Sequence, residues 1–205
     1  MKKLLIASMN QGKIKELASF LSDLPIGLIS LPDLGIKDEV AETENTYQKN
    51  SQKKARFYAK KTGFPAIADD GGIEIDALKG EPGIKSRRWL GYEARDEEII
   101  NHMKTVAKKL PYSNRKAYFR AVISFALPDG KVWSREGKIE GIVPEKPYLK
   151  LLRGYPYRSF FYLPKIGKYY HENELTEDEQ KLYNHRYKAI RKLKPIIIKT
   201  LGLKE

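Results

Sequence analysis

Two adjacent carboxylates, Asp69 and Asp70, stand where a short apolar segment meets a pair of glycines. Neighbouring side chains of a strand point to opposite faces, so we expect the strand to end here and the glycines to form a turn. At such a strand end both acids can reach one region, where carboxylates can hold a divalent metal ion and activate a water molecule. A solvated turn is the alternative, because Asp and Gly are ordinary turn residues.

A segment suited to binding phosphate, Ser8-Met9-Asn10-Gln11-Gly12-Lys13, lies between the first expected strand and the first expected helix. Gly12 permits close approach of the backbone, and a helix N-terminus offers N–H groups to an anion. Lys13 adds a mobile cation. The spacing is not that of a P-loop, so a turn without function is the alternative.

Two further pairs of polar residues fall in expected helices. Asn50 and Lys54 are four residues apart, so they share a helix face and can present an amide and an ammonium group to one anion. His185 and Arg186 adjoin each other in the last long helix, where they could contact a triphosphate or a base. For both pairs, solvated helix residues are the alternative.

The elements that must position these residues alternate at first between strands and helices. Apolar runs predict strands over 3–8, 26–31 and from 66 to 69, and periodic apolar residues predict helices from 14, over 46–61 and over 96–110. Segments 116–127 and 131–142 flank Pro-Asp-Gly, which is typical of a hairpin. A basic helix is expected over 177–193, with a short one after Pro195. The class is therefore mixed α/β.

Composition narrows the kinds of partner and site. The net charge of +13, from 39 Lys and Arg against 26 Asp and Glu among 205 residues, favours anionic partners, with a merely solvated basic surface as the alternative. The absence of cysteine excludes disulfides, thiolate catalysis and cysteine-ligated zinc. With three His and no His cluster, a metal would be held by carboxylates. The N-terminal apolar run is too short for a signal peptide or a membrane span, so we expect a cytoplasmic protein that enters no membrane.

Taken in order, these segments resemble the inosine triphosphate pyrophosphatase family, which hydrolyses non-standard purine nucleoside triphosphates. The family's S/T-x-N-x-G-K is matched from Ser8 to Lys13, and its E-T-G-x-T-F-x-E-N-A-x-x-K-A is matched in part from Glu42 to Ala55. Its D-D-S-G-L and the A-L-x-G-x-P-G-x-x-S that follows are matched within residues 69–86, and its late S-H-R at residues 185–186. The resemblance covers nearly the whole chain.

The resemblance implies a fold and partners. The family fold is α/β, with an elongated curved mixed β-sheet flanked by helices, in two lobes with the active site in the cleft between them. Residues 1–205 would form one such domain. Family members are usually homodimers, and the ion would be Mg²⁺, with Mn²⁺ as the alternative.

The resemblance also implies a role for each matched residue. The metal would be held by Glu42 and Asp69, with Asp70 near. Asp70 would orient or deprotonate a water that attacks the α-phosphorus, which releases pyrophosphate and a nucleoside monophosphate. The implied contacts to the nucleotide are Ser8, Asn10, Lys13, Asn50, Lys54, Gly71, Tyr155, Arg158, Gln180, Lys181, His185 and Arg186.

The chain departs from the family pattern at several positions. A customary Glu is Lys49, the serine of D-D-S-G is Gly71, the base-reading Asp is Arg158, and a customary Lys is Gln180, with Lys181 one residue later. The aromatic platform is retained in Tyr155. Because a guanidinium prefers acceptors where a carboxylate prefers donors, we hypothesise that the reaction centre is kept and the base pocket is rebuilt. The alternative is a nucleotide-binding sensor or partner subunit with little turnover. No recognition motif supports nucleic-acid binding.

Overall fold

The computed structural model describes residues 2–152 and 154–203, and within them the strands form one seven-stranded sheet. The strands are β1 (Lys3–Ile6), β2 (Gly27–Ser30), β3 (Ala66–Ile75), β4 (Lys116–Ala126), β5 (Val132–Ile142), β6 (Tyr162–Leu163) and β7 (Lys168–Tyr169). Their order is β2-β1-β3-β4-β5-β6-β7. β1 is parallel to β2 and β3, whereas β6 is antiparallel to β5 and β7. The sheet is therefore mixed.

Helices flank this sheet, which confirms the expected fold class. The α-helices of the described residues are α1 (Gln11–Phe20), α2 (Tyr47–Thr62), α3 (Asp96–Lys109), α4 (Glu177–Leu182) and α5 (His185–Leu201). Short 3-10 helices are η1 (Pro32–Leu34), η2 (Asp76–Leu78), η3 (Gly83–Arg88) and η4 (Arg158–Phe160). No helix in the described ranges is both long and apolar enough to cross a membrane.

The chain divides into two compact units. The first unit consists of the residues up to Asp70, Ala121–Gly137 and the residues from Arg186 onward.

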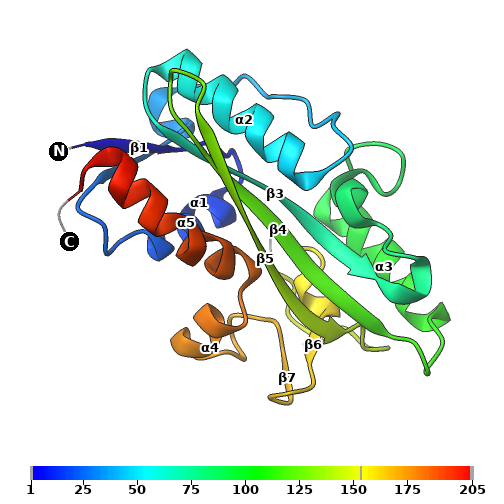
Figure 1. The fold of residues 1–205 in the computed structure, drawn as a ribbon. Helices are drawn as coiled ribbons and strands as arrows, with labels where there is room; N and C mark the ends of the chain where they lie inside the picture. Colours follow the sequence, from blue (N-terminus) through cyan, green and yellow to red (C-terminus); the bar gives the residue numbers. More distant parts are fainter. Residues whose placement is uncertain (1, 153, 204–205) are drawn as a thin grey trace. The chain divides into compact units, whose positions relative to one another are not determined.

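The first unit has a hydrophobic core on each face of its strands. On one face Ala55, Tyr58 and Ala59 of α2 pack against Leu5 of β1 and Ala66 and Ala68 of β3. On the other face Leu17 of α1 and Ile190 of α5 pack against Leu4, Ile6 and Ile67. Figure 1 shows α2 on one side of these strands and α1 and α5 on the other. Alternate residues of one strand thus serve opposite cores, as the period of two requires.

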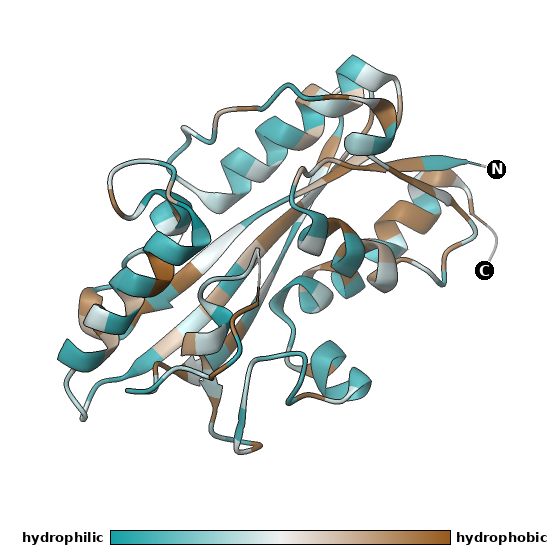
Figure 2. Ribbon diagram, turned by 180° about the vertical axis from the view of Figure 1, so that it is seen from behind, coloured by the Kyte–Doolittle hydropathy of each residue, from teal (hydrophilic) through white to brown (hydrophobic). Residues whose placement is uncertain are grey.

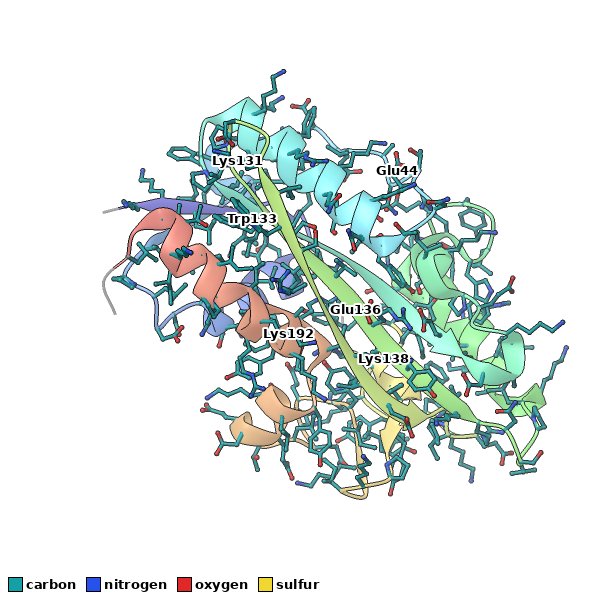
Figure 3. The ribbon with its side chains drawn as sticks, in the orientation of Figure 1. Glu44, Lys131, Trp133, Glu136, Lys138 and Lys192 are labelled. Atoms are coloured by element: carbon teal, nitrogen blue, oxygen red, sulfur yellow. The ribbon has the colours of Figure 1, made fainter. Side chains whose placement is uncertain are left out.

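Contacts among α5, β4 and β5 add to the packing of the first unit. Lys192 of α5 donates a hydrogen bond to the Glu136 carbonyl oxygen of β5 over 2.8 Å, and both residues are labelled in Figure 3. The ring of Trp133 stacks on Phe125 of the neighbouring strand, with centroids 5.6 Å apart. Strands β4 and β5 are adjacent and joined by a tight turn in which Gly130 N–H donates to the Leu127 carbonyl oxygen, which confirms the predicted hairpin.

The second unit consists of Gly71–Arg120 and Lys138–His185 and has a core of its own. Helix α3 buries an apolar stripe that includes Ile99, Ile100 and Met103, in one cluster with Phe119 of β4 and Ile139 of β5. Figure 2 shows the apolar colour along the strands and polar colour on the outer faces of the helices. Each unit therefore has the apolar interior needed to hold its polar residues in fixed positions.

The expectation that a strand ends at Asp69 is wrong. Strand β3 continues through both acids and both glycines to Ile75. At Gly72 a Cβ atom would collide with Ser86 Oγ and the Gly83 carbonyl oxygen. Ser86 Oγ accepts a hydrogen bond from Ile73 N–H (3.1 Å) and donates to the Gly83 carbonyl oxygen (2.6 Å). Gly72 therefore serves close packing of η3 on the strand, and no turn is formed there.

The expected break at Pro195 is also wrong. Helix α4 ends at Leu182, and α5 runs from His185 to Leu201 with Pro195 inside it. The buried residues Ile190, Leu193 and Ile197 continue one apolar stripe past the proline. Packing of this stripe outweighs the backbone hydrogen bond that proline cannot donate, which explains why a local rule failed here.

Candidate functional site

The two acids lie on β3 just beyond the point where β1 stops pairing with it. The register ends at Ile6 and Ile67, and Ala7 N–H donates to the Ile67 carbonyl oxygen over 2.8 Å. Asp69 and Asp70 follow directly and are 2% and 4% exposed. Although their side chains leave opposite faces of the strand, the end of β1 lets groups approach both around the strand edge. The acids are therefore brought into one region by the end of β1 and not by a turn.

Asp69 is held by two cations of the first unit. Its Oδ1 lies 3.2 Å from Lys13 Nζ of α1, and its Oδ2 accepts a hydrogen bond from Arg186 Nε of α5 over 2.9 Å. Burial alone would raise the pKa of Asp69, but Lys13, Arg186 and Lys54 outweigh burial and hold that pKa well below its usual range. Asp69 is therefore an ionised group at all ordinary pH values.

Asp70 has the opposite electrostatic character. Its Oδ2 accepts a hydrogen bond from Asn50 Nδ2 of α2 over 2.9 Å. Burial and the neighbouring Glu42 carboxylate raise the pKa of Asp70 to about 6, against the opposing effects of Lys54, Asn50 and Lys13. A carboxyl group with a pKa this close to neutrality can both hold and release a proton under physiological conditions, as a general base must.

Glu42 joins the cluster through Lys54. The Lys54 ammonium donates to Glu42 Oε1 and, over 2.5 Å, to the Asp69 carbonyl oxygen. Burial alone would lower the pKa of Lys54, but the carboxylates of Glu42, Asp69 and Asp70 outweigh burial and hold that pKa above its usual value. Lys53 donates to the Ala41 carbonyl oxygen over 2.9 Å, which fixes the loop that carries Glu42. Helix α2 thus positions the cluster with Asn50 and Lys54, the pair predicted to share a face.

The turn before α1 is shaped by Ser8 and Asn10. Asn10 is the N-cap, and its Oδ1 accepts a hydrogen bond from Lys13 N–H over 3.1 Å. Ser8 Oγ accepts from Asn10 N–H over 3.2 Å. The helix begins at Gln11, so Gly12 and Lys13 lie in its first turn, at the positive N-terminal end of the helix dipole. These contacts place the Lys13 ammonium against Asp69.

The acidic residues fit a hard divalent cation. Carboxylate oxygens are the ligands that Mg²⁺ prefers, and mutual repulsion with Glu42 contributes to the raised pKa of Asp70. A buried acid and a half-buried acid that repel one another favour a cation between them. Asp69 differs, because both of its oxygens already face cations. Within the described ranges, no three acidic or histidine side chains are preassembled at metal-binding spacing.

A second group of predicted residues meets in the second unit. The guanidinium carbon of Arg158 lies 3.8 Å from the ring centroid of Tyr155 and 4.6 Å from that of Tyr170. Tyr170 Oη and His185 Nδ1 are 3.4 Å apart. The His185 ring in turn stacks on Phe119, with centroids 5.1 Å apart and planes 18° apart. We call these five residues the aromatic column.

Other predicted residues engage in local contacts. The side chain of Gln180 donates to the Leu175 carbonyl oxygen over 3.2 Å, and Lys181 is exposed, 4.0 Å from Asp178. The side chain of Lys49 is exposed on α2, and Gly71 is half-buried within β3. Within the described residues, neither Gln180 nor Lys181 forms a hydrogen bond or ion pair with another predicted site residue.

Sequence reasoning missed three contributors. Glu16 forms an ion pair with Arg186 Nη1 over 3.2 Å. Its position about one helical turn after Lys13 could have indicated that it faces the same region. Tyr170 and Phe119 complete the aromatic column. Phe119 lies within β4 and Tyr170 directly follows β7, where an aromatic usually belongs to the core, so their neighbours could not be read from the chain.

Comparison with known proteins agrees with this arrangement. Residues 4–196 match the sequence profile of the Ham1 family. The chain is 37% identical to a dITP/XTP pyrophosphatase of Thermoanaerobacter sp. over 97% of its length and 98% of that protein. It is 39% identical to the dITP/XTP pyrophosphatase of Thermus thermophilus, over 93% of this chain and 89% of that one.

A solved structure has the same fold. A HAM1 protein from Coxiella burnetii superposes with a TM-score of 0.81 at 31% identity, over 97% of this chain and all of that one. The predicted family membership is thereby confirmed: the chain belongs to the Ham1 family, the inosine triphosphate pyrophosphatase family that its motifs resemble.

Proposed function

We propose that this chain hydrolyses the triphosphates of non-standard purines, such as dITP, ITP and XTP, to the nucleoside monophosphate and pyrophosphate. The observation that carries the proposal is buried Asp70, whose pKa is raised to about 6 beside the cations Lys13 and Lys54. Its curated relatives bear the name dITP/XTP pyrophosphatase. A base beside several cations suits water attack on a polyanionic phosphate chain.

Asp70 acts as the general base. In its ionised form it accepts a proton from the water that attacks the α-phosphorus, and pyrophosphate departs. The Asn50 amide donates to the carboxylate oxygen Oδ2 over 2.9 Å and thereby orients the base. A positioned base of this kind accelerates proton transfer by about 10² to 10⁴-fold.

The cations of the first unit stabilise the triphosphate. Lys13 and Lys54 offset negative charge that builds up on the phosphate oxygens, and the N-terminus of α1 contributes N–H groups beside Lys13. Ser8 and Asn10 hold the turn in the shape that these contacts require. Asp69 remains ionised and fixes Lys13 and Arg186 through its two oxygens.

A divalent ion completes the charge balance. Glu42 and Asp70 would hold Mg²⁺, with Asp69 beside them, and Mn²⁺ has the same preference for oxygen ligands. When bound, such an ion would offset the negative charge of the phosphates and would lower the pKa of a water molecule bound to it.

The base is assigned to the second unit. Tyr155, Arg158 and His185 belong to the aromatic column, which offers a ring platform and a guanidinium. Gly71, Gln180 and Lys181 are included in the site because of their places in the family motifs.

The proposal also includes the assembly and the location of the protein. The chain would form one two-lobed domain, act as a homodimer and be located in the cytoplasm. Light scattering at micromolar concentration measures the oligomeric state.

The test is release of pyrophosphate with Mg²⁺ over a panel of dITP, ITP, XTP and the standard triphosphates. Water labelled with ¹⁸O should place the label in the monophosphate, because the α-phosphorus is attacked. Asp178→Asn is the matched control, since the Asp178 side chain is 98% exposed. Label in the pyrophosphate, or orthophosphate as the product, would contradict the proposal.

The alternative is a nucleotide sensor with little turnover. The family pattern carries a lysine at position 180, whereas the Gln180 side chain here donates to the nearby Leu175 carbonyl oxygen. This difference favours the sensor. Binding of dITP without release of pyrophosphate from any member of the panel would support the sensor.

A further inference from the structure

The guanidinium of Arg158 contacts two tyrosine rings, since its carbon lies 3.8 Å from the centroid of Tyr155 and 4.6 Å from that of Tyr170. Arg158 is 8% exposed, Tyr170 is 2% exposed and Tyr155 is half-buried. The outer ring of this stack is therefore Tyr155. A guanidinium keeps its charge at every physiological pH, so the column carries a fixed positive charge directly behind its outer ring.

The other titratable ring beside Arg158 adds no negative charge. His171 follows Tyr170 in the chain, is 3% exposed, and accepts a hydrogen bond at Nδ1 from Asn173 N–H over 3.2 Å. Burial and then Arg158 lower the pKa of His171, against Glu172, Glu174 and the Lys150 carbonyl. The ring is therefore neutral near pH 7, with its proton on Nε2. Glu172 is exposed and Glu174 half-buried, so water screens both carboxylates.

The charge of the base distinguishes the candidate substrates. Xanthine has carbonyl groups at positions 2 and 6 and loses a ring proton near neutral pH, so its nucleotides carry a negative base. Hypoxanthine has one carbonyl group and stays neutral at the same pH. A base stacked on the outer face of Tyr155 would lie about 7 Å from the guanidinium carbon, at which distance two opposite charges still attract appreciably in a medium of intermediate dielectric constant.

We propose that Arg158 makes this site selective for the anionic xanthine base over the neutral hypoxanthine base. The proposal rests on the proposed function, because it concerns the base of the same substrates. The family pattern has an Asp at this position, and a carboxylate would repel the xanthine anion. The change to Arg158 therefore reverses the sign of the discrimination, whereas the relatives' names place dITP and XTP together.

The experiment measures binding, so it does not depend on turnover. Dissociation constants for xanthosine monophosphate and inosine monophosphate are determined by calorimetry at neutral pH with Mg²⁺. We expect the wild-type chain to bind the xanthine nucleotide at least about tenfold more tightly, the effect of one favourable charge interaction. Arg158→Gln should bring the ratio close to one, and Arg158→Asp should bring it below one.

Two further variants separate charge from folding. Arg158→Lys keeps the charge and should keep most of the preference, and Arg135→Gln, at an exposed arginine of β5, should leave the ratio unchanged. Equal binding of both nucleotides by the wild-type chain, binding of neither, or a ratio unaffected by Arg158→Gln would overturn the proposal. If the ratio behaves as expected while no triphosphate releases pyrophosphate, the proposed hydrolysis fails and the base selectivity stands.

Discussion

The Asn50 side chain links the loop that carries Glu42 to the candidate base Asp70. Its Nδ2 donates to Asp70 Oδ2 over 2.9 Å, and its Oδ1 accepts from Glu44 N–H over 3.0 Å. Asn50 is fully buried, so neither bond competes with water. One amide thus fixes both the orientation of the base and the loop beside it.

Asn50→Ala should destabilise the chain and further raise the pKa of Asp70. The loss of two buried hydrogen bonds is expected to lower the free energy of unfolding by about 1 to 3 kcal/mol, and the carboxylate loses a donor that favours its ionised form. Urea denaturation measures the stability change. Gln48→Ala, at an exposed position of the same helix, is the control and should change little. Equal stability of both variants would contradict this role.

The pKa shifts of Asp70 and Asp69 predict opposite effects of pH on stability without divalent ions. The folded pKa of Asp70, about 6, lies above its unfolded value near 3.9. Its contribution to stability is therefore present below pH ~4 and is lost as the pH rises through ~6. Asp70→Asn should be more stable than the wild-type chain at pH 7, by about 1 to 3 kcal/mol.

Asp69→Asn provides the contrast. The folded pKa of Asp69 is depressed, so its contribution is present at neutral pH and is lost only as the pH falls below the unfolded value. This variant should be less stable at pH 7, and the difference should shrink in acid. Urea melts of both variants between about pH 2 and pH 7 test the pair. Parallel pH curves would refute the electrostatic account.

Arg186→Gln should remove a cation that two buried carboxylates share. Arg186 contacts Asp69 over 2.9 Å and Glu16 over 3.2 Å, and the three side chains are all largely buried. Removal of one partner from a buried ion pair typically costs about 3 to 5 kcal/mol of folding free energy. Arg191→Gln, at an exposed position of the same helix, should cost little. Thermal melts that coincide for the two variants would exclude a structural role for the Arg186 bridge.

Gly72→Ala should destabilise the second unit. The added methyl group would meet Ser86 Oγ and the Gly83 carbonyl oxygen, and the backbone oxygen cannot rotate away. Overpacking of this kind costs about 1 to 3 kcal/mol. Denaturation of the variant measures the change. A loss below about 0.5 kcal/mol, which is typical of a neutral surface change, would mean that η3 can move away from β3.

Much of the architecture could be predicted from local patterns. The periodic apolar residues of 46–61 and 96–110 predicted α2 and α3 to within two residues, and the Pro-Asp-Gly turn predicted the hairpin. These signals are local, since a helix face or a turn is encoded by neighbouring residues.

The failures came where tertiary packing overrides a local rule. The strand continues past Asp70 because Gly72 packs on η3. Helix α5 continues past Pro195 because its buried apolar stripe extends beyond the proline. Glu42, Lys13 and Asp69 could be grouped only through the family resemblance. The neighbours of Arg158 could not be foreseen, because side chains that stack across loops leave no spacing signal.

Single-turnover hydrolysis of dITP by the Asp70→Asn variant, beside the wild-type chain and the Asp178→Asn control, tests the central claim most directly. We expect the rate of pyrophosphate release to fall by about 10² to 10⁴-fold in Asp70→Asn alone, with dITP still bound. Wild-type rates in that variant would contradict the assignment of Asp70 as the base.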